Sequence, residues 1–90
     1  MQVIWETRAE NDLAGYQDYI HQFNPKASID VVDRIFDCVD TITEQPLMGK
    51  PGRIDGTREF AIPDLPLTLI YRVQEASLII VILHHHRKKR

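Results

Sequence analysis

The chain has 90 residues, of which 43% are apolar and 27% charged, and a formal net charge of −2 at pH 7. This length allows one domain with a modest core, and the apolar content excludes a disordered tail. The longest apolar run, residues 78–83, is far too short to cross a membrane. The start, Met1 to Glu6, lacks the features of a signal peptide. With Cys38 as the single cysteine, we expect one domain over residues 1–90 in the reducing cytoplasm.

The near-neutral total hides an uneven distribution of charge. Residues 1–49 carry three basic and nine acidic side chains, a charge of −6, whereas residues 50–90 carry eight basic and four acidic ones, a charge of +4. The acidic half is typical of helix faces that point to solvent. The basic half is a candidate surface for an anionic partner, either nucleic acid or an acidic protein.

The first elements in chain order are a short strand and a helix. Residues 2–5 are apolar-rich and predict the strand. Thr7 and Glu10 have the spacing of a capping box, in which each side chain bonds the other residue's amide. The helix that follows is predicted to end near residues 21–23, and its apolar face is formed by Ala9, Leu13, Tyr16 and Ile20.

A second helix is predicted to begin at Asn24 and Pro25. Asparagine is a good N-cap, and proline is favoured at the first helical position because its missing donor is not needed there. This helix should end before Pro46. The short link makes the two helices an antiparallel hairpin, and the apolar stripe of the second helix comprises Ala27, Val31, Ile35, Cys38, Val39 and Ile42.

Residues 46–56, rich in proline and glycine, predict a loop. Strands are expected over residues 57–62, 67–73 and 78–84. Because residues 78–83 show no alternation, the last strand is expected to be central and buried on both faces. The fold class is therefore α+β, with the order β-α-α-β-β-β and the helical hairpin packed on one face of a small, mainly antiparallel sheet.

The chain resembles the RelE/ParE superfamily of bacterial type II toxins, also called plasmid stabilization proteins. The resemblance implies a toxin that slows growth and is neutralised by a cognate antitoxin, whose complex with the toxin binds operator DNA through the antitoxin. It rests on an ordered set of segments: Trp5 with Ala9 and Asp12-Leu13, Asn24-Pro25-Lys26-Ala27, Pro46-Leu47-Met48-Gly49-Lys50, Gly52-Arg53, Gly56-Thr57-Arg58-Glu59-Phe60, Ile70-Tyr71-Arg72-Val73, Ile82-Leu83-His84 and Arg87.

Two activities are known in this superfamily, namely inhibition of DNA gyrase by ParE-like members and ribosome-dependent cleavage of messenger RNA by RelE-like members. The long hairpin and the segment from Gly56 to Glu59 look more like the ParE side. Thr68 stands where RelE-like nucleases usually carry an arginine, which also favours gyrase. Arg87 matches a second nuclease arginine, so the messenger RNA endoribonuclease remains the alternative.

If the chain is an enzyme, we expect a metal-independent endoribonuclease without a cofactor. Histidine suits proton transfer near neutral pH, and arginine can hold the charge of a pentavalent phosphate. The candidate catalytic residues are thus His84, His86, Arg87 and Arg58. The simpler interpretation, which we favour, is that the histidines only end the sheet in solvent. A metal site is not expected, because only His84 and His86 of the histidine run share a strand face and no further ligand lies beside them.

For binding a gyrase or ribosomal target, the sequence offers basic residues near strand ends. We expect the sheet face opposite the helices to present them, while Tyr71 and Trp5 pack in the core. Arg72 should lie on that opposite face with Ile70. The candidate target-binding residues are Lys50, Arg53, Arg58, Arg72, Arg87 and Lys88.

Overall fold

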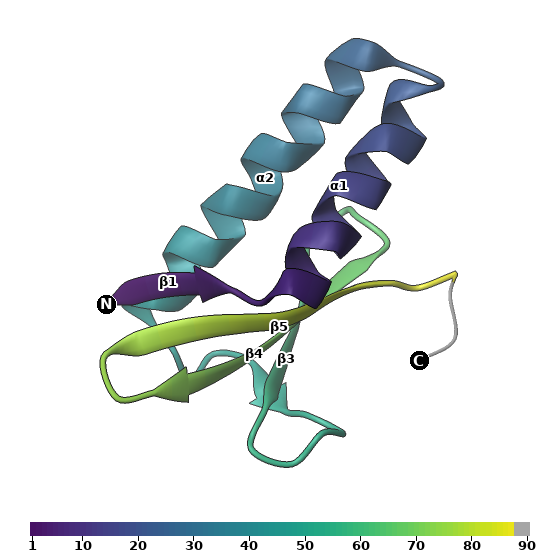
Figure 1. The fold of residues 1–90 in the computed structure, drawn as a ribbon. Helices are drawn as coiled ribbons and strands as arrows, with labels where there is room; N and C mark the ends of the chain where they lie inside the picture. Colours follow the sequence, from purple (N-terminus) through teal and green to yellow (C-terminus); the bar gives the residue numbers. More distant parts are fainter. Residues whose placement is uncertain (88–90) are drawn as a thin grey trace.

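The computed structural model describes residues 1–87. Its elements follow the order β1 (Gln2–Trp5), α1 (Thr7–His21), α2 (Pro25–Glu44), β2 (Lys50–Pro51), β3 (Arg58–Ala61), β4 (Leu67–Gln74) and β5 (Ser77–His85). The five strands form one sheet in the order β1-β5-β4-β3-β2. β1 runs parallel to β5, and the other neighbouring strands are antiparallel. The two helices lie side by side over one face of the sheet (Figure 1), which confirms the predicted fold class.

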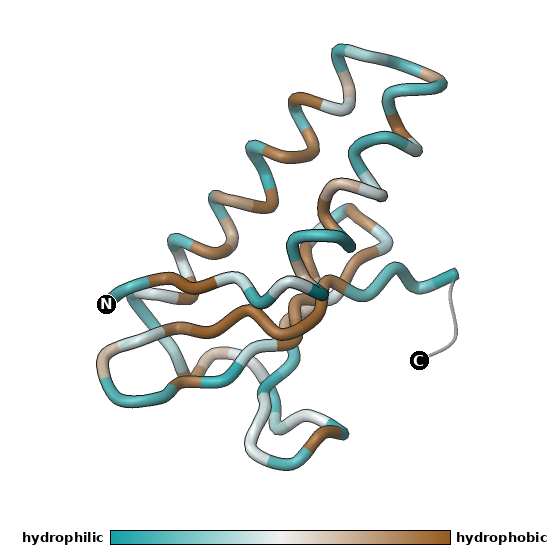
Figure 2. Tube along the Cα trace, viewed as in Figure 1, coloured by the Kyte–Doolittle hydropathy of each residue, from teal (hydrophilic) through white to brown (hydrophobic). Residues whose placement is uncertain are grey.

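The hydrophobic core lies between the hairpin and the sheet. Figure 2 shows a long hydrophobic stretch in β5, and hydrophobic positions that alternate with hydrophilic ones along both helices. Each buried aliphatic or aromatic side chain contributes roughly 1.5–3 kcal/mol by leaving water. The buried cluster joins Ala9 and Tyr16 of α1, Ile35, Val39 and Ile42 of α2, and Leu67, Leu69, Tyr71, Leu78, Ile80 and Leu83 of the strands.

The start of α2 confirms the sequence prediction, and the start of α1 corrects it. The Asn24 side chain accepts from the Ala27 amide at 3.1 Å. At α1 the N-cap is Glu6, without a side-chain capping bond, and Thr7 is already helical, so the capping box of Thr7 and Glu10 does not form. The reason is that the Glu6 amide continues the pairing of β1 by donating to the Ile80 carbonyl at 2.9 Å, which fixes where the helix can begin.

β5 lies inside the sheet, between β1 and β4, but its burial differs from the prediction. Leu78, Ile80 and Leu83 are buried, whereas Ile79 and Ile82 are only partly buried on the other face. A register shift opposite residues 70 and 71 leaves Val81 as an extra residue in β5. The continuous apolar run of residues 78–83 therefore does not mean that β5 is buried on both faces. One face of β5 is buried, the other is only partly buried, and the bulge adds one more apolar residue.

The predicted loop 46–56 contains a two-residue strand, β2, that sequence reasoning missed. Lys50 pairs with Glu59 and Pro51 pairs with Arg58. Proline cannot donate to a ladder, but it is tolerated on an edge strand such as this one. Among residues 1–87, no helix has both the length and the apolarity needed to cross a membrane.

Candidate functional site

A buried tyrosine ties the loop after α2 to the sheet. The Tyr71 hydroxyl donates to the Pro46 carbonyl at 2.8 Å and accepts from the Gly49 amide at 3.0 Å. Tyr71 is fully buried, which confirms that it is a core residue with a satisfied hydroxyl. A Cβ on Gly49 would lie 2.6 Å from this hydroxyl, so glycine is required there.

Arg58 holds the same loop from the neighbouring strand. It stands opposite Tyr71 in the register of β3 and β4, so its side chain leaves the sheet on the helix-covered face. Its Nη1 donates to the Gly49 carbonyl at 2.7 Å and to the Leu47 carbonyl at 3.4 Å. Sequence reasoning expected Arg58 to be displayed. The structure instead gives it two backbone acceptors in the segment that follows α2, where the helical ladder no longer pairs these carbonyls.

Lys50 and Arg53 are exposed basic residues on a loop with a defined backbone. The Gly52 amide donates to the Thr57 carbonyl at 2.8 Å. The Arg53 amide donates to the Glu59 carboxylate at 3.1 Å. These bonds hold the backbone while leaving both basic side chains exposed.

The face of the sheet opposite the helices is less basic than the sequence predicts. Arg72 does lie on this face, paired with Ile79, but its Nη1 is 3.6 Å from a Glu6 carboxylate oxygen. Beside it, Ile70 is paired with Ile82 and is fully buried. The centre of this face is therefore apolar, because the apolar run of β5 places isoleucines on both sides of the sheet.

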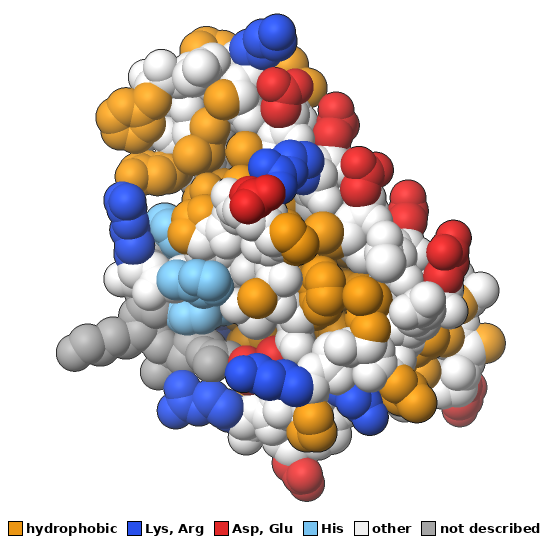
Figure 3. All heavy atoms as spheres, turned by 180° about the vertical axis from the view of Figure 1, so that it is seen from behind, with side chains coloured by type: hydrophobic (Ala, Val, Ile, Leu, Met, Phe, Trp, Pro, Cys, Tyr) orange, Lys and Arg blue, Asp and Glu red, His pale blue; other side chains and the backbone are white. Residues whose placement is uncertain are grey.

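The histidines divide between the two faces at the end of β5. The rings of His84 and His86 are 6.1 Å apart, and the Thr68 hydroxyl is 2.8 Å from Nε2 of His86. His85 instead meets the edge of the Tyr16 ring at 5.2 Å. Figure 3 shows histidines together near one edge, basic side chains spread from top to bottom, and a row of acidic side chains along the opposite edge. Within residues 1–87, no group of three His, Cys, Asp or Glu residues is placed to hold a metal.

Arg87 lies beside α1 and not on the open face of the sheet. Its Nη1 is 3.3 Å from the Tyr19 hydroxyl. Burial raises the pKa of Tyr16, and the neighbouring Tyr19 hydroxyl raises it further. The positive charge of Arg87 acts in the opposite direction. Tyr16 therefore remains a protonated donor near neutral pH. Lys88, also a candidate, lies outside the described residues.

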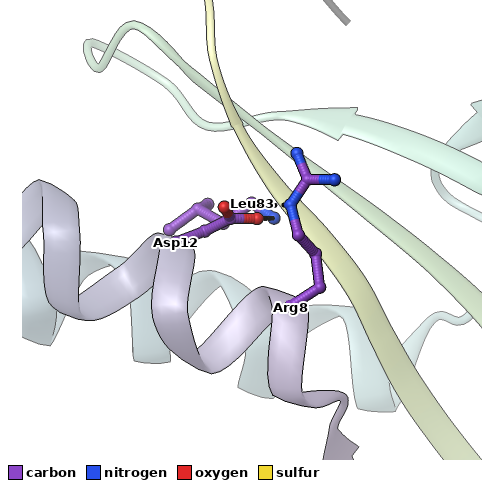
Figure 4. A network of polar contacts seen from close by, with 3 residues as sticks. All are labelled: Arg8, Asp12 and Leu83. Atoms are coloured by element: carbon purple, nitrogen blue, oxygen red, sulfur yellow. Dashed lines mark hydrogen bonds and ion pairs between the residues drawn. The ribbon is translucent and has the colours of Figure 1, made fainter.

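Asp12 has a role that sequence reasoning did not identify. Its Oδ2 accepts from the Leu83 amide at 3.0 Å, and Nε of Arg8 lies 3.2 Å from its Oδ1 (Figure 4). The pairing of β1 with β5 ends at Trp5 and Ile80, so a helix side chain replaces the missing strand at Leu83. The sequence shows Arg8 and Asp12 at helical spacing, but nothing in it points to residue 83.

The described candidate residues thus lie in separate places. Lys50, Arg53 and Arg58 belong to the end formed by β2 and β3. Arg72 and His84 lie on the open face of the sheet, at different pairs along β4 and β5. Arg87 contacts α1. His84 and Arg87 line one hollow beside α1, but Arg58 and Arg72 lie elsewhere. The structure therefore does not bring all of these candidates together around one point, as cleavage of a phosphodiester would require.

A family model described as "ParE toxin of type II toxin-antitoxin system, parDE" matches residues 3–89. The chain belongs to this toxin family. The ParE assignment agrees with the resemblance to the RelE/ParE superfamily seen in the sequence, and that identification is confirmed.

Relatives of this ParE-family chain carry toxin names. Y4kP of Sinorhizobium fredii, which bears a provisional toxin name, is 39% identical over 71 residues, covering 79% of this chain and 74% of that protein. Toxin RelE2 of Caulobacter vibrioides is 39% identical over 49 residues, covering 54% of this chain and 56% of that protein. A structure titled as a chromosomal ParDE TA system from P. aeruginosa matches with a TM-score of 0.85 and 20% identity, over 94% of this chain and 95% of that one. At this identity the structural match shows the shared fold alone.

Proposed function

We propose that this ParE-family chain is the growth-inhibiting component of a two-protein module and is neutralised by a cognate antitoxin. The family match over residues 3–89 supports this proposal, since it covers nearly the whole chain. The toxin would act in the cytoplasm, where gyrase and ribosomes are found. Its complex with the antitoxin would bind operator DNA through the antitoxin.

DNA gyrase is the target that we favour. The observation that supports it is the distance of Arg58 from the other candidate catalytic groups, of which His84 and Arg87 line one hollow. Arg58 donates to backbone carbonyls, His86 lies against the Thr68 hydroxyl, and Arg87 contacts Tyr19 on the helix side. Proton transfer and charge stabilisation need groups placed around a single phosphate. An inhibitor that acts by binding needs only a complementary surface, to which Lys50 and Arg53 contribute exposed charge.

The test is gyrase supercoiling in vitro with the purified toxin. The double variant K50S/R53S should weaken inhibition by roughly tenfold or more, because both changes remove charge at a contact surface. The matched control is Lys26→Ser, which removes an exposed charge at the start of α2, away from β2. If the wild-type toxin leaves supercoiling unaffected while its induction cuts messenger RNA, gyrase is the wrong target.

Ribosome-dependent RNA cleavage is the second candidate. It is favoured by the two histidine rings, His84 and His86, which lie 6.1 Å apart beside Thr68 at the end of the sheet. The double variant H84Q/H86Q should then abolish cleavage detected by primer extension after induction, whereas His21→Gln at the end of α1 should not. Cleavage that survives in the folded double variant would exclude histidine catalysis.

For the antitoxin, the hairpin offers an apolar hollow of about 390 Å³. Its lining includes Trp5, Leu13, Ala14 and Phe36, and the Phe36 side chain is 44% exposed although its ring lies 5.7 Å from that of Trp5. A partner segment with an apolar anchor would bury these groups, in the manner of helix-in-groove recognition.

Thermal melting with and without the co-expressed antitoxin tests this proposal. Binding to the folded toxin alone should raise its melting temperature. Phe36→Ser should weaken the complex by roughly tenfold or more, because buried aromatic residues dominate such interfaces. Val73→Ser on β4, with a similar exposure of 40%, is the control. An unchanged melting temperature in the presence of the antitoxin would contradict neutralisation by direct binding.

A further inference from the structure

A second hollow, of about 370 Å³, lies between α1 and the C-terminal part of β5. It is separate from the hollow between the helices and from the exposed Lys50 and Arg53. Its floor is apolar, formed by Leu67 and Leu83 of the sheet. Its volume falls in the range of small-molecule sites. Aromatic and polar side chains form its walls: Asn11, Tyr16, Tyr19, His85 and Arg87.

Gly15 lies on the lining of this pocket. It lies in the middle of α1, where glycine is less favourable than almost any other residue. Its φ is not in the left-handed region, and a Cβ at this position would meet nothing within 4 Å. Neither the backbone nor a neighbouring side chain therefore requires glycine here. What the glycine does provide is free space above α1, at the wall of the pocket.

One end of the pocket carries the Arg87 guanidinium and two tyrosines, Tyr16 and Tyr19. Tyr16 is 8% exposed and lies on the lining of the pocket beside Tyr19. Arg87 stands close by, with its Nη1 3.3 Å from the Tyr19 hydroxyl. Two phenol groups and a guanidinium form a donor set for an oxyanion.

The other end of the pocket is nearly neutral. Arg8 lines it, but its guanidinium is paired with the Asp12 carboxylate at 3.2 Å. Between the two ends stand the rings of Tyr16, Tyr19 and His85, with centroid separations of 5.2–6.3 Å. A fitting ligand therefore has a flat, uncharged body and a single anionic group at one end.

We propose that this pocket binds one nucleotide, with its phosphate at Arg87 and the tyrosine hydroxyls and its base against the aromatic wall. The Asn11 amide lies on the lining where it can pair with a base edge. Stacking of single bases on aromatic side chains is a common mode of recognition. An acidic peptide fits less well, because it carries charge along its length and has no flat neutral body. The proposal goes beyond the toxin's target and does not depend on it.

Calorimetric titration of the full-length toxin with the four 5′-mononucleotides tests the proposal. The chemical shifts of the Gly15, Tyr16 and Leu83 amides should follow the binding. Gly15→Leu should abolish binding by filling the pocket, without lowering the melting temperature, since leucine favours the helix. The matched control is Ala14→Leu, one position earlier and on the lining of the other hollow, which should bind as the wild type does. Arg87→Gln should weaken binding roughly tenfold or more.

The same titration distinguishes two sources of the nucleotide, the end of a nucleic acid and a free nucleotide. Short single strands with a 5′-phosphate that bind tenfold tighter than the mononucleotide would indicate the end of a nucleic acid. Equal affinities would indicate a free nucleotide, and both results support the proposal. The proposal is overturned if no nucleotide binds at roughly millimolar concentration, if Gly15→Leu binds normally, or if inorganic phosphate or an acidic peptide without aromatic residues competes equally well.

Discussion

Replacing Tyr71 by phenylalanine should destabilise the domain far more than the loss of one hydroxyl suggests. The hydroxyl donates to the Pro46 carbonyl and accepts from the Gly49 amide, at 2.8 and 3.0 Å. Phenylalanine keeps the ring and its packing between helices and sheet. The substitution therefore isolates two hydrogen bonds that join the sheet to the loop after α2.

The expected loss in the free energy of unfolding follows from the burial of the two groups that bond the Tyr71 hydroxyl. Gly49 is buried, so its amide is left without an acceptor, at a cost of about 1–3 kcal/mol. Pro46 is only partly buried, so water can reach its carbonyl, and the loss there is about 0.5–1.5 kcal/mol. The total of about 1.5–4.5 kcal/mol is a large share of the roughly 5–15 kcal/mol that stabilises a small domain. The melting temperature should fall by roughly 10–25 °C.

Urea unfolding followed by circular dichroism, together with calorimetric melting, measures this loss. Tyr19→Phe is the control, because Tyr19 is 39% exposed and its hydroxyl has a long contact of 3.3 Å with Arg87. That control should change the free energy of unfolding by less than about 0.5 kcal/mol. The double variant with Arg58→Ala should lose less than the sum of the single losses, since both residues hold one loop. A Tyr71→Phe melting temperature within about 3 °C of the wild type would refute the reasoning.

Three further predictions concern other parts of the chain. Asp12→Ala removes the acceptor of the Leu83 amide and should lower the free energy of unfolding by about 1–2 kcal/mol in urea titration; equal stability would mean that water replaces the carboxylate. Glu75→Gly relieves a left-handed residue with φ 56° and should raise the free energy of unfolding by about 1 kcal/mol; a lower unfolding midpoint would contradict this. Burial raises the pKa of the Cys38 thiol, against the opposing charge of Arg34. Cys38 should therefore react with a thiol reagent more slowly in the folded than in the unfolded chain at pH about 8. The stability that the protonated thiol contributes is fully present below the pKa of Cys38 in the unfolded chain, and it is lost as the pH rises through the pKa of Cys38 in the folded chain. Equal reaction rates in the folded and unfolded chains would oppose the prediction.

The helices could be predicted from the sequence because their causes are local. The apolar spacing along α2 and the pair Asn24 and Pro25 fix its face and its start without reference to the sheet. The start of α1 could not be fixed in this way. There the Glu6 amide pairs with the Ile80 carbonyl, and this contact spans most of the chain.

The candidate site could be predicted only in part, because charge in a sequence does not show which partner a side chain takes. Lys50 and Arg53 are exposed as expected. Arg58 and Arg72 have the same charge, but one donates to carbonyls of the loop after α2 and the other pairs with Glu6. These partners depend on the strand register, which places Arg58 and Arg72 on opposite faces of the sheet.

The position of Arg58 makes a loss of toxicity on its replacement ambiguous. Its guanidinium holds the carbonyls of residues 47 and 49, and the loop so held carries the exposed Lys50 and Arg53. Losing Arg58 therefore acts on the same surface as losing those two charges, but through the position of the loop and not through contact with a target. Stability separates the two routes. A variant of Lys50 or Arg53 that loses inhibition should keep its melting temperature, because an exposed side chain contributes little to folding. A variant of Arg58 should lose both together, since two carbonyls in one segment lose their donor.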